Sequence, residues 1–241
     1  MKRWIPYIPP IWAVFFDGVI TAIAVGVSLY VRSPSQTIHR QIPLPIGVAL
    51  LVVAFSVSSL VSYATQYQET VRVREETRRT ILDMALEQLL SKYRDEIADC
   101  KLRANVMVVE KRWNLGLPPT RNRYLTFEET YGTYNEAELE QEYVLGTGCA
   151  GTALKNDNPT YYDSQEKDGL SKSLSHTQQE ITSHVNSILS VPIYPDSDPS
   201  RRPIGVLSID SPENISETKL DEEPARRLTM KYAGAVGDVV S

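Results

Sequence analysis

An uncharged run of nineteen residues, 46–64, is the feature that most constrains how this chain can fold. A second apolar run lies before it at residues 11–31, in which Asp17 is the single charged residue. Because an α-helix rises 1.5 Å per residue, the two runs would form helices of about 28 and 31 Å, close to the ~30 Å hydrocarbon core of a bilayer. We therefore predict two transmembrane helices within residues 1–64.

The residues around these runs predict their orientation. Residues 32–45 contain three prolines and can join two antiparallel helices but form little else. Basic residues near the ends of spans favour the cytoplasmic side, and six lie outside the helix pair against two, Arg32 and Arg40, in the link. We expect a multi-pass protein of a bacterial inner membrane, in contact with membrane lipid and with both termini in the cytoplasm. The alternative for residues 11–31 is a cleaved signal peptide, which is disfavoured because no small-residue cleavage site closes the run.

Asp17 is the exception within the first run. A carboxylate inside a span costs on the order of 2.5–3.5 kcal/mol, so such a group faces protein or water rather than lipid. One interpretation is a pore carboxylate in an oligomer, and the other is a solvated side chain near the cytoplasmic boundary. In the second run, serines such as Ser59 either line a polar seam of the pore or permit close helix packing. Asp17 and Ser59 are the candidate pore residues.

The remainder of the chain is rich in charge, as a soluble domain is. Residues 65–241 hold 21 of the 25 basic and 29 of the 30 acidic side chains, which leaves them a net charge of −8. That charge excludes wholesale coating of nucleic acid, which needs a basic surface. Residues 100–241 are enough for one globular domain rather than two. Two scattered cysteines form no disulfide framework and fit a reducing compartment.

A connector helix is predicted over residues 65–99, between the second span and this domain. Residues 67–99 contain neither Gly nor Pro and are rich in helix-forming residues. Five apolar side chains recur there at helical spacing: Leu82, Leu86, Leu89, Tyr93 and Ile97. This stripe either packs on the soluble domain or pairs with copies of itself and carries movement into the second span.

Beyond residue 100 the pattern becomes that of an α/β domain, with period-two alternation along its first strand. Four strands are predicted, at residues 102–109, 123–127, 187–194 and 203–210. The segment 195–202, rich in Pro, Asp and Ser, is a hairpin loop. A glycine-rich turn opens a short helix within residues 145–154, and residues 215–240 are predicted to form a closing helix.

Three segments of this domain stand out together: Gly146-x-Gly148-x-x-Gly151, Ile188-Leu-Ser-Val-Pro-Ile193 and Ile204-Gly-Val-Leu-Ser-Ile-Asp210. In this order they resemble a GAF domain, over about residues 85–241. The resemblance implies a central antiparallel sheet with a helical layer on one face and a ligand pocket on the other. The expected fold is a two-helix transmembrane hairpin, a connector helix and a cytoplasmic α/β GAF-like domain, in residues 1–64, 65–99 and 100–241.

In GAF domains the pocket is closed by the segment between the glycine-turn helix and the hairpin, here residues 155–187. Tyrosine rings in it can stack on a base, and Lys or His can meet a phosphate. The backbone amides of the glycine turn are a further candidate site for phosphate. Each loop side chain can also be an exposed residue without a ligand. The candidate ligand-binding residues are Gly148, Cys149, Tyr161, Tyr162, Lys172 and His176.

Catalytic motifs and metal-ligand spacing are not found in the sequence, so we expect no catalytic residue, no bound metal and no cofactor. The three histidines, His39, His176 and His184, are spread over the link and the pocket segment. An enzyme that uses Cys149 as a nucleophile is the catalytic alternative, and it would require a lowered thiol pKa.

These features predict a ligand-sensing membrane effector rather than an enzyme. The GAF-like domain would bind a small nucleotide-type ligand, and the connector helices would gate an oligomeric channel formed by the spans. The organisation resembles two-span membrane effectors of bacterial anti-phage signalling systems, which implies a homo-oligomer and a nucleotidyltransferase encoded nearby. The alternative is a membrane-tethered sensory or dimerisation subunit that signals to a separate kinase or regulator.

Overall fold

The computed structural model describes residue 23 and residues 44–114, 120–166 and 173–241, with the backbone alone for residues 44–56, 112–114 and 120–122. The chain divides into two compact units, Lys2–Glu76 and Thr77–Ser241.

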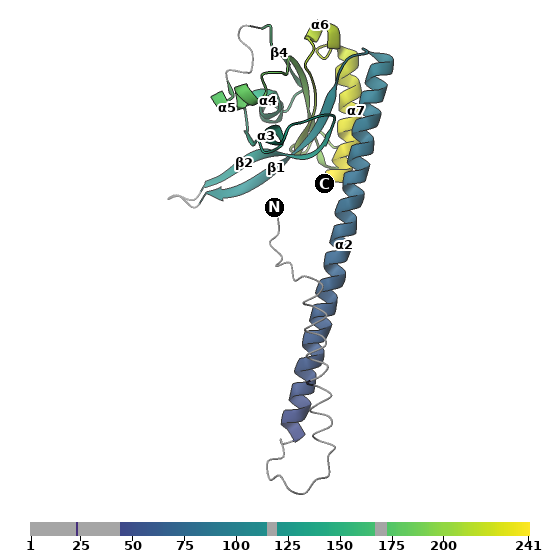
Figure 1. Cartoon of the computed structure of the whole chain (residues 1–241), viewed down its shortest axis with the longest axis vertical. Helices are drawn as coiled ribbons and strands as arrows, with labels where there is room; N and C mark the ends of the chain where they lie inside the picture. Colours follow the sequence, from purple (N-terminus) through teal and green to yellow (C-terminus); the bar gives the residue numbers. More distant parts are fainter. Residues whose placement is uncertain (1–22, 24–43, 115–119, 167–172) are drawn as a thin grey trace. The chain divides into compact units, whose positions relative to one another are not determined.

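One long helix, α2 (Leu44–Glu96), spans 53 residues and is drawn in blue in Figure 1. Its sequence has no proline after Pro45 and no glycine after Gly47, and its second half is rich in strong helix formers. The helix includes the second predicted span and all but the last three residues of the predicted connector. In Lys2–Glu76 the side chains of Leu60 and Tyr63 are exposed.

The predicted membrane spans lie largely outside the described part of the chain. The first span, 11–31, lies outside it apart from residue 23, and so do the side chains of residues 46–56 in the second. Within the described residues, no helix is long and apolar enough to cross a membrane. The transmembrane hairpin therefore stays a prediction from the sequence.

In Thr77–Ser241, the described residues form one six-stranded antiparallel sheet with the order β3-β2-β1-β6-β5-β4. The strands are β1 (Arg103–Asn114), β2 (Thr120–Tyr131), β3 (Tyr143–Val144), β4 (Thr160–Asp163), β5 (Ser187–Ile193) and β6 (Gly205–Ser211). The antiparallel sheet and the four predicted strands are confirmed, although β1 and β2 extend well beyond their predicted bounds. β3 and β4 were not predicted because two and four residues are too few to show a period.

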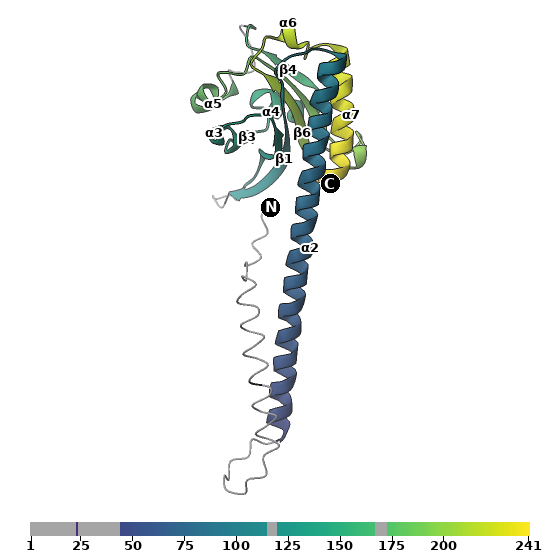
Figure 2. The same ribbon diagram turned by 45° about the vertical axis from the view of Figure 1, so that its right-hand side comes forward.

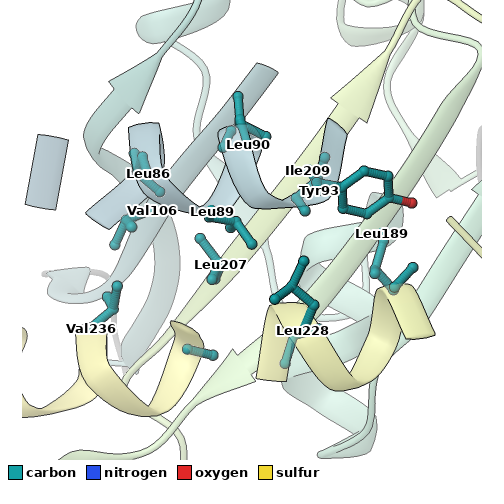
Figure 3. Packing of buried hydrophobic residues seen from close by; sticks show 14 of the residues in the cluster. Leu86, Leu89, Leu90, Tyr93, Val106, Leu189, Leu207, Ile209, Leu228 and Val236 are labelled. Atoms are coloured by element: carbon teal, nitrogen blue, oxygen red, sulfur yellow. The ribbon is translucent and has the colours of Figure 1, made fainter. Parts of the chain in front are cut away.

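α2 and α7 (Glu223–Val240) lie along one face of the sheet, as Figures 1 and 2 show. The main hydrophobic core is formed by residues of these two helices and of the strands beneath them. Successive side chains of a strand point to opposite faces, so alternate residues of the central strands meet the helices. Figure 3 shows the resulting cluster, whose labelled members are Leu86, Leu89, Leu90, Tyr93, Val106, Leu189, Leu207, Ile209, Leu228 and Val236. The apolar stripe predicted along the connector thus packs on its own domain.

The predicted closing helix, 215–240, is two helices rather than one: α6 (Ile215–Thr218) and α7. Lys219 caps α6 in the left-handed region with φ 57°, which ends the first helix. Pro224, in the first turn of α7, suits a helix start because its missing N–H has no partner to lose there. The hydroxyl of Tyr93 donates to the carbonyl of Thr218 at 2.8 Å and so joins α2 to α6.

The opposite face of the sheet carries the shorter helices α3 (Glu136–Leu139), α4 (Gly148–Asn156) and α5 (His176–Ile181), which Figure 2 shows on the other side of the strands from α2 and α7. A short 3₁₀ turn, η2 (Pro195–Ser197), lies in the predicted hairpin loop. A second, smaller core forms between α4 and the sheet, from Met107, Leu125, Tyr143, Ala150, Leu154 and Val206.

Candidate functional site

Two adjoining cavities lie on the face that carries α3, α4 and α5, with volumes of about 70 and 150 Å³. The first lies over β1 and β6, and the second lies between α4, α5 and β5. At about 10–15 Å³ for each water-sized position, they hold on the order of five and ten such positions. They share the lining residues Gly148, Cys149, Leu174, Thr182, Val185 and Ile188.

Arg103 is the centre of a buried ion-pair network on the wall of the first cavity. Its Nε donates to Asp210 Oδ1 at 2.6 Å. Its terminal nitrogens donate to the Glu138 carboxylate at 3.1 and 3.2 Å and to the Thr133 carbonyl at 2.9 Å. The guanidinium also lies over the ring of Tyr134, 4.1 Å from its centroid. One cation is therefore shared by two carboxylates.

Asp210 and Glu138 are held in different ways. Burial raises the pKa of Asp210, while Arg103 and the Tyr134 hydroxyl, which donates to Oδ2 at 2.8 Å, oppose the rise. Glu138 closes the capping box of α3 with Asn135. Nε2 of His184 lies 3.2 Å from Glu138 Oε1, so a protonated imidazolium would add a second cation to the network.

Asn105 lies beside this network with its amide orientation determined by its neighbours. Nδ2 donates to the Tyr134 hydroxyl at 3.0 Å and faces Asp210 Oδ2 at 3.4 Å. The reversed amide would place its oxygen against that carboxylate, while the Tyr134 proton is already donated to Asp210. Oδ1 of Asn105 is buried and has no hydrogen-bond partner among the described residues.

A chain of small polar groups continues from the sheet to α4. The hydroxyls of Ser208 and Ser190 lie 2.8 Å apart. Ser190 also hydrogen-bonds Cys149, whose thiol donates to the Thr160 carbonyl at 3.1 Å. Burial raises the pKa of the Cys149 thiol to about 12, although the hydrogen bonds with Ser190 lower it. A thiol that is protonated at neutral pH does not fit the nucleophile that a Cys149 enzyme would need.

The glycine turn uses its own backbone amides within the fold. Gly146 N donates to the Gly151 carbonyl and Gly148 N to Ser173 Oγ, both at 2.8 Å, and Gly151 N donates to the Thr147 carbonyl at 3.1 Å. Gly146 and Gly148 have φ of 87° and 62°, which glycine adopts without steric cost. A phosphate that used the amides of Gly146, Gly148 or Gly151 would have to displace these bonds. The phosphate site at this turn stays a prediction from the sequence.

The six predicted ligand-binding residues fall in different places. Gly148 and Cys149 line both cavities, and Tyr162 lines the second. Tyr161, by contrast, is 39% exposed and its ring lies under the guanidinium of Arg226, outside both cavities. The exposed His176 pairs with Glu180 of its own helix.

The other predicted site residues give less information. Lys172 and the candidate pore residue Asp17 lie outside the described residues. Ser59, the second candidate pore residue, lies on α2 with an exposed side chain.

Sequence reasoning missed the polar wall of the first cavity, from Arg103, Asn105, Tyr134, Glu138 and Asp210. One signal was present. The alternation along residues 102–109 places two polar residues, Arg103 and Asn105, on the face opposite Ala104 and Val106. In a half-buried strand, polar residues at alternate positions indicate a face that is exposed to solvent. Here that face is buried, because segments from elsewhere in the chain cover it.

No family model matches the sequence, and no curated protein matches it either. Among solved structures, the chain is similar to the GAF domain region of a protein from Geobacter sulfurreducens PCA, at 18% identity and a TM-score of 0.49, covering 71% of this chain and 97% of that one. It is also similar to the GAF domain of an Acinetobacter phosphoenolpyruvate-protein phosphotransferase, at 15% identity and a TM-score of 0.45, covering 73% and 92%.

Proposed function

We propose that this chain is a ligand-sensing membrane effector that acts as a homo-oligomeric channel in a bacterial inner membrane. A small molecule binds in the two cavities of the GAF-like domain. The packing of α2 on that domain then changes, and the two spans predicted in residues 1–64 open or close. Both termini lie in the cytoplasm, where the ligand is sensed.

The observation that carries this proposal is the extent of α2. The same helix includes the uncharged residues 46–64 and, further along, Leu82, Leu86 and Leu89, which are fully buried in the core of the domain. A helix bound to the sheet at one end and inserted in lipid at the other is a direct physical link between a cytoplasmic ligand and a membrane segment.

The sheet supplies the step between the cavity and α2. Along β6, Ser208 and Asp210 line the first cavity, whereas Leu207 and Ile209 belong to the core on which α2 packs. A ligand that shifts β6 by a fraction of an ångström therefore alters both faces at once, because packed interiors transmit displacement. This coupling supports gating through α2.

The setting proposed for this effector is anti-phage signalling. A nucleotidyltransferase encoded nearby would make a nucleotide-type ligand, whose base, rather than its phosphate, would enter the first cavity. An effector that depolarises the membrane on such a signal would stop the growth of an infected cell.

Induced expression with a membrane-potential dye tests the channel. We expect expression of the wild-type chain to depolarise cells, and Glu75→Pro in α2 to change that depolarisation, because a proline inside a helix interrupts it. Glu75→Ala keeps the helix and is the matched control. A membrane-inserted wild-type chain that leaves the potential intact would favour the alternative, a membrane-tethered sensory subunit that signals to a separate kinase or regulator.

A further inference from the structure

We propose that the first cavity selects an uncharged group that donates an N–H hydrogen bond, such as an amide or the ring N–H of a base, and that it excludes anions. This inference rests on the proposed sensing function and specifies which part of the ligand the cavity recognises.

The first step is the acceptor of Asn105. This residue lines the first cavity and is only 3% exposed, and its Oδ1 has no donor among the described residues. The neighbouring Asp210 and Tyr134 hold its amide in this orientation, so Asn105 cannot turn to relieve the missing bond. A buried acceptor without a donor is costly. Oδ1 itself is covered against a water-sized probe, so a ligand N–H reaches it when a neighbouring side chain of the wall shifts, and the hydrogen bond that then forms removes that cost.

The second step is the charge around the cavity. Among the described lining residues, the charged ones are Arg103, Glu138 and Asp210, with a net charge of −1. The guanidinium already donates four hydrogen bonds, to these two carboxylates and to the Thr133 carbonyl. An anion would have to take donors from a satisfied network and enter a negatively charged wall, which is unfavourable in a buried site.

The third step is the shape and polarity of the remaining wall. The ring of Phe127 lies 6.4 Å from that of Tyr143 at an interplanar angle of 72°, and 6.1 Å from that of Tyr134. Much of the rest of the wall is aliphatic: Met107, Leu174, Val185 and Ile188. Thr182, Ser190 and Ser208 add hydroxyls, and those of Ser190 and Ser208 hydrogen-bond each other. A mainly aromatic and aliphatic wall beside the Asn105 acceptor that has no donor among the described residues suits a flat, neutral molecule whose N–H determines its orientation.

The test uses the full chain in detergent and two probes of the same shape, benzamide and benzoate. Benzamide is uncharged and donates N–H, whereas benzoate is an anion without a donor. We expect isothermal titration to show that benzamide binds at least about tenfold more tightly than benzoate, since one hydrogen bond is worth roughly that factor. Benzoate binding as tightly as benzamide, or neither probe binding, would overturn the proposal.

A pair of variants locates the interaction. Asn105→Leu removes the acceptor at similar volume, and we expect it to weaken benzamide binding about tenfold. Asn214→Leu makes the same change at the start of α6, away from both cavities, and leaves binding unchanged. If Asn105→Leu binds benzamide as tightly as the wild type does, the proposal is contradicted. If this variant does not fold, the comparison of benzamide with benzoate on the wild-type chain still tests the proposal.

The two proposals fail separately. Depolarisation in cells needs no added probe, so a chain that depolarises cells but prefers benzoate retains the channel and loses the selection for N–H donors. A chain that prefers benzamide but leaves the potential intact retains the selectivity and loses the channel.

Discussion

At the residue scale, the first cavity is bounded by side chains that depend on one another. Arg103 pairs with two acids, so its removal would leave the buried carboxylates of Asp210 and Glu138 without their guanidinium partner, a situation that costs several kcal/mol. Cys149, on the shared wall, behaves instead as a small buried side chain whose thiol donates a hydrogen bond. Most polar groups at this site therefore bond to one another and stabilise the wall of the cavity.

The buried thiol gives a prediction that alkylation can check. In a Cys100→Ser chain, Cys149 should react with iodoacetamide at pH 8 about 1000-fold more slowly when folded than in urea, because its pKa is raised from 9.0 to about 12 and each pKa unit lowers the thiolate fraction tenfold. The direction of this pKa shift also determines how stability depends on pH. Below pH 9 the thiol is protonated in both states, and from 9 to 12 only the unfolded state ionises, so stability falls over that window. Equal rates with and without urea would contradict the burial.

At the scale of elements, each central strand has two different faces. β6 presents Leu207 and Ile209 to the helical layer and Ser208 and Asp210 to the cavity, and β1 divides its residues in the same way. α2 is one-sided in the same domain, with Leu86 fully buried and Met84 52% exposed. Burial rather than helix propensity therefore determines which of its residues matter for stability.

This contrast along α2 is testable with two substitutions to the same residue. We expect Leu86→Ala to lower the midpoint of thermal unfolding of the detergent-solubilised chain by about 4–20 °C, because a buried leucine leaves a cavity. Met84→Ala, at an exposed position of the same helix, should change it by no more than about 2 °C. Circular dichroism measures both, and equal effects would contradict the packing of the stripe on this domain.

At the scale of the whole molecule, the distribution of charge separates two environments. Residues 1–64 carry a single acid, Asp17, whereas residues 65–241 carry 29. A lone carboxylate in an apolar segment is costly unless water or protein surrounds it. In a homo-oligomeric channel, a ring of such carboxylates would attract cations.

The channel therefore predicts a role for Asp17 in ion preference. Asp17→Asn keeps the size and removes the charge, so it should reduce the preference for cations while leaving expression intact. Asp17→Leu should insert at least as well as the wild type, because it removes the insertion cost, yet impair conduction. Currents across planar bilayers compare the three chains. Identical currents with the same ion preference would show that Asp17 does not line a pore.

Local patterns in the sequence predicted much of the fold of residues 77–241. The stripe from Leu82 to Tyr93 is a helix because its apolar residues recur with the period of a helix turn, and the four longest strands follow from alternation or β-branched runs. The turn around Gly146 and Gly148 followed from their positions before an apolar helix. These features depend only on residues that are close in the sequence, which is why a single sequence is enough to predict them.

Tertiary structure alone decided the cavity and its chemistry. Arg103 and Asp210 are 107 positions apart and meet because β1 pairs with β6. Asn105 is buried and hydrogen-bonds Tyr134, which is 29 positions away. The amides of Gly146, Gly148 and Gly151 already donate to Ser173 and to carbonyls of the turn itself. The periodicity of a sequence predicts which face of a helix or strand is apolar. The groups that a polar face contacts depend instead on which distant segments of the chain pack against it.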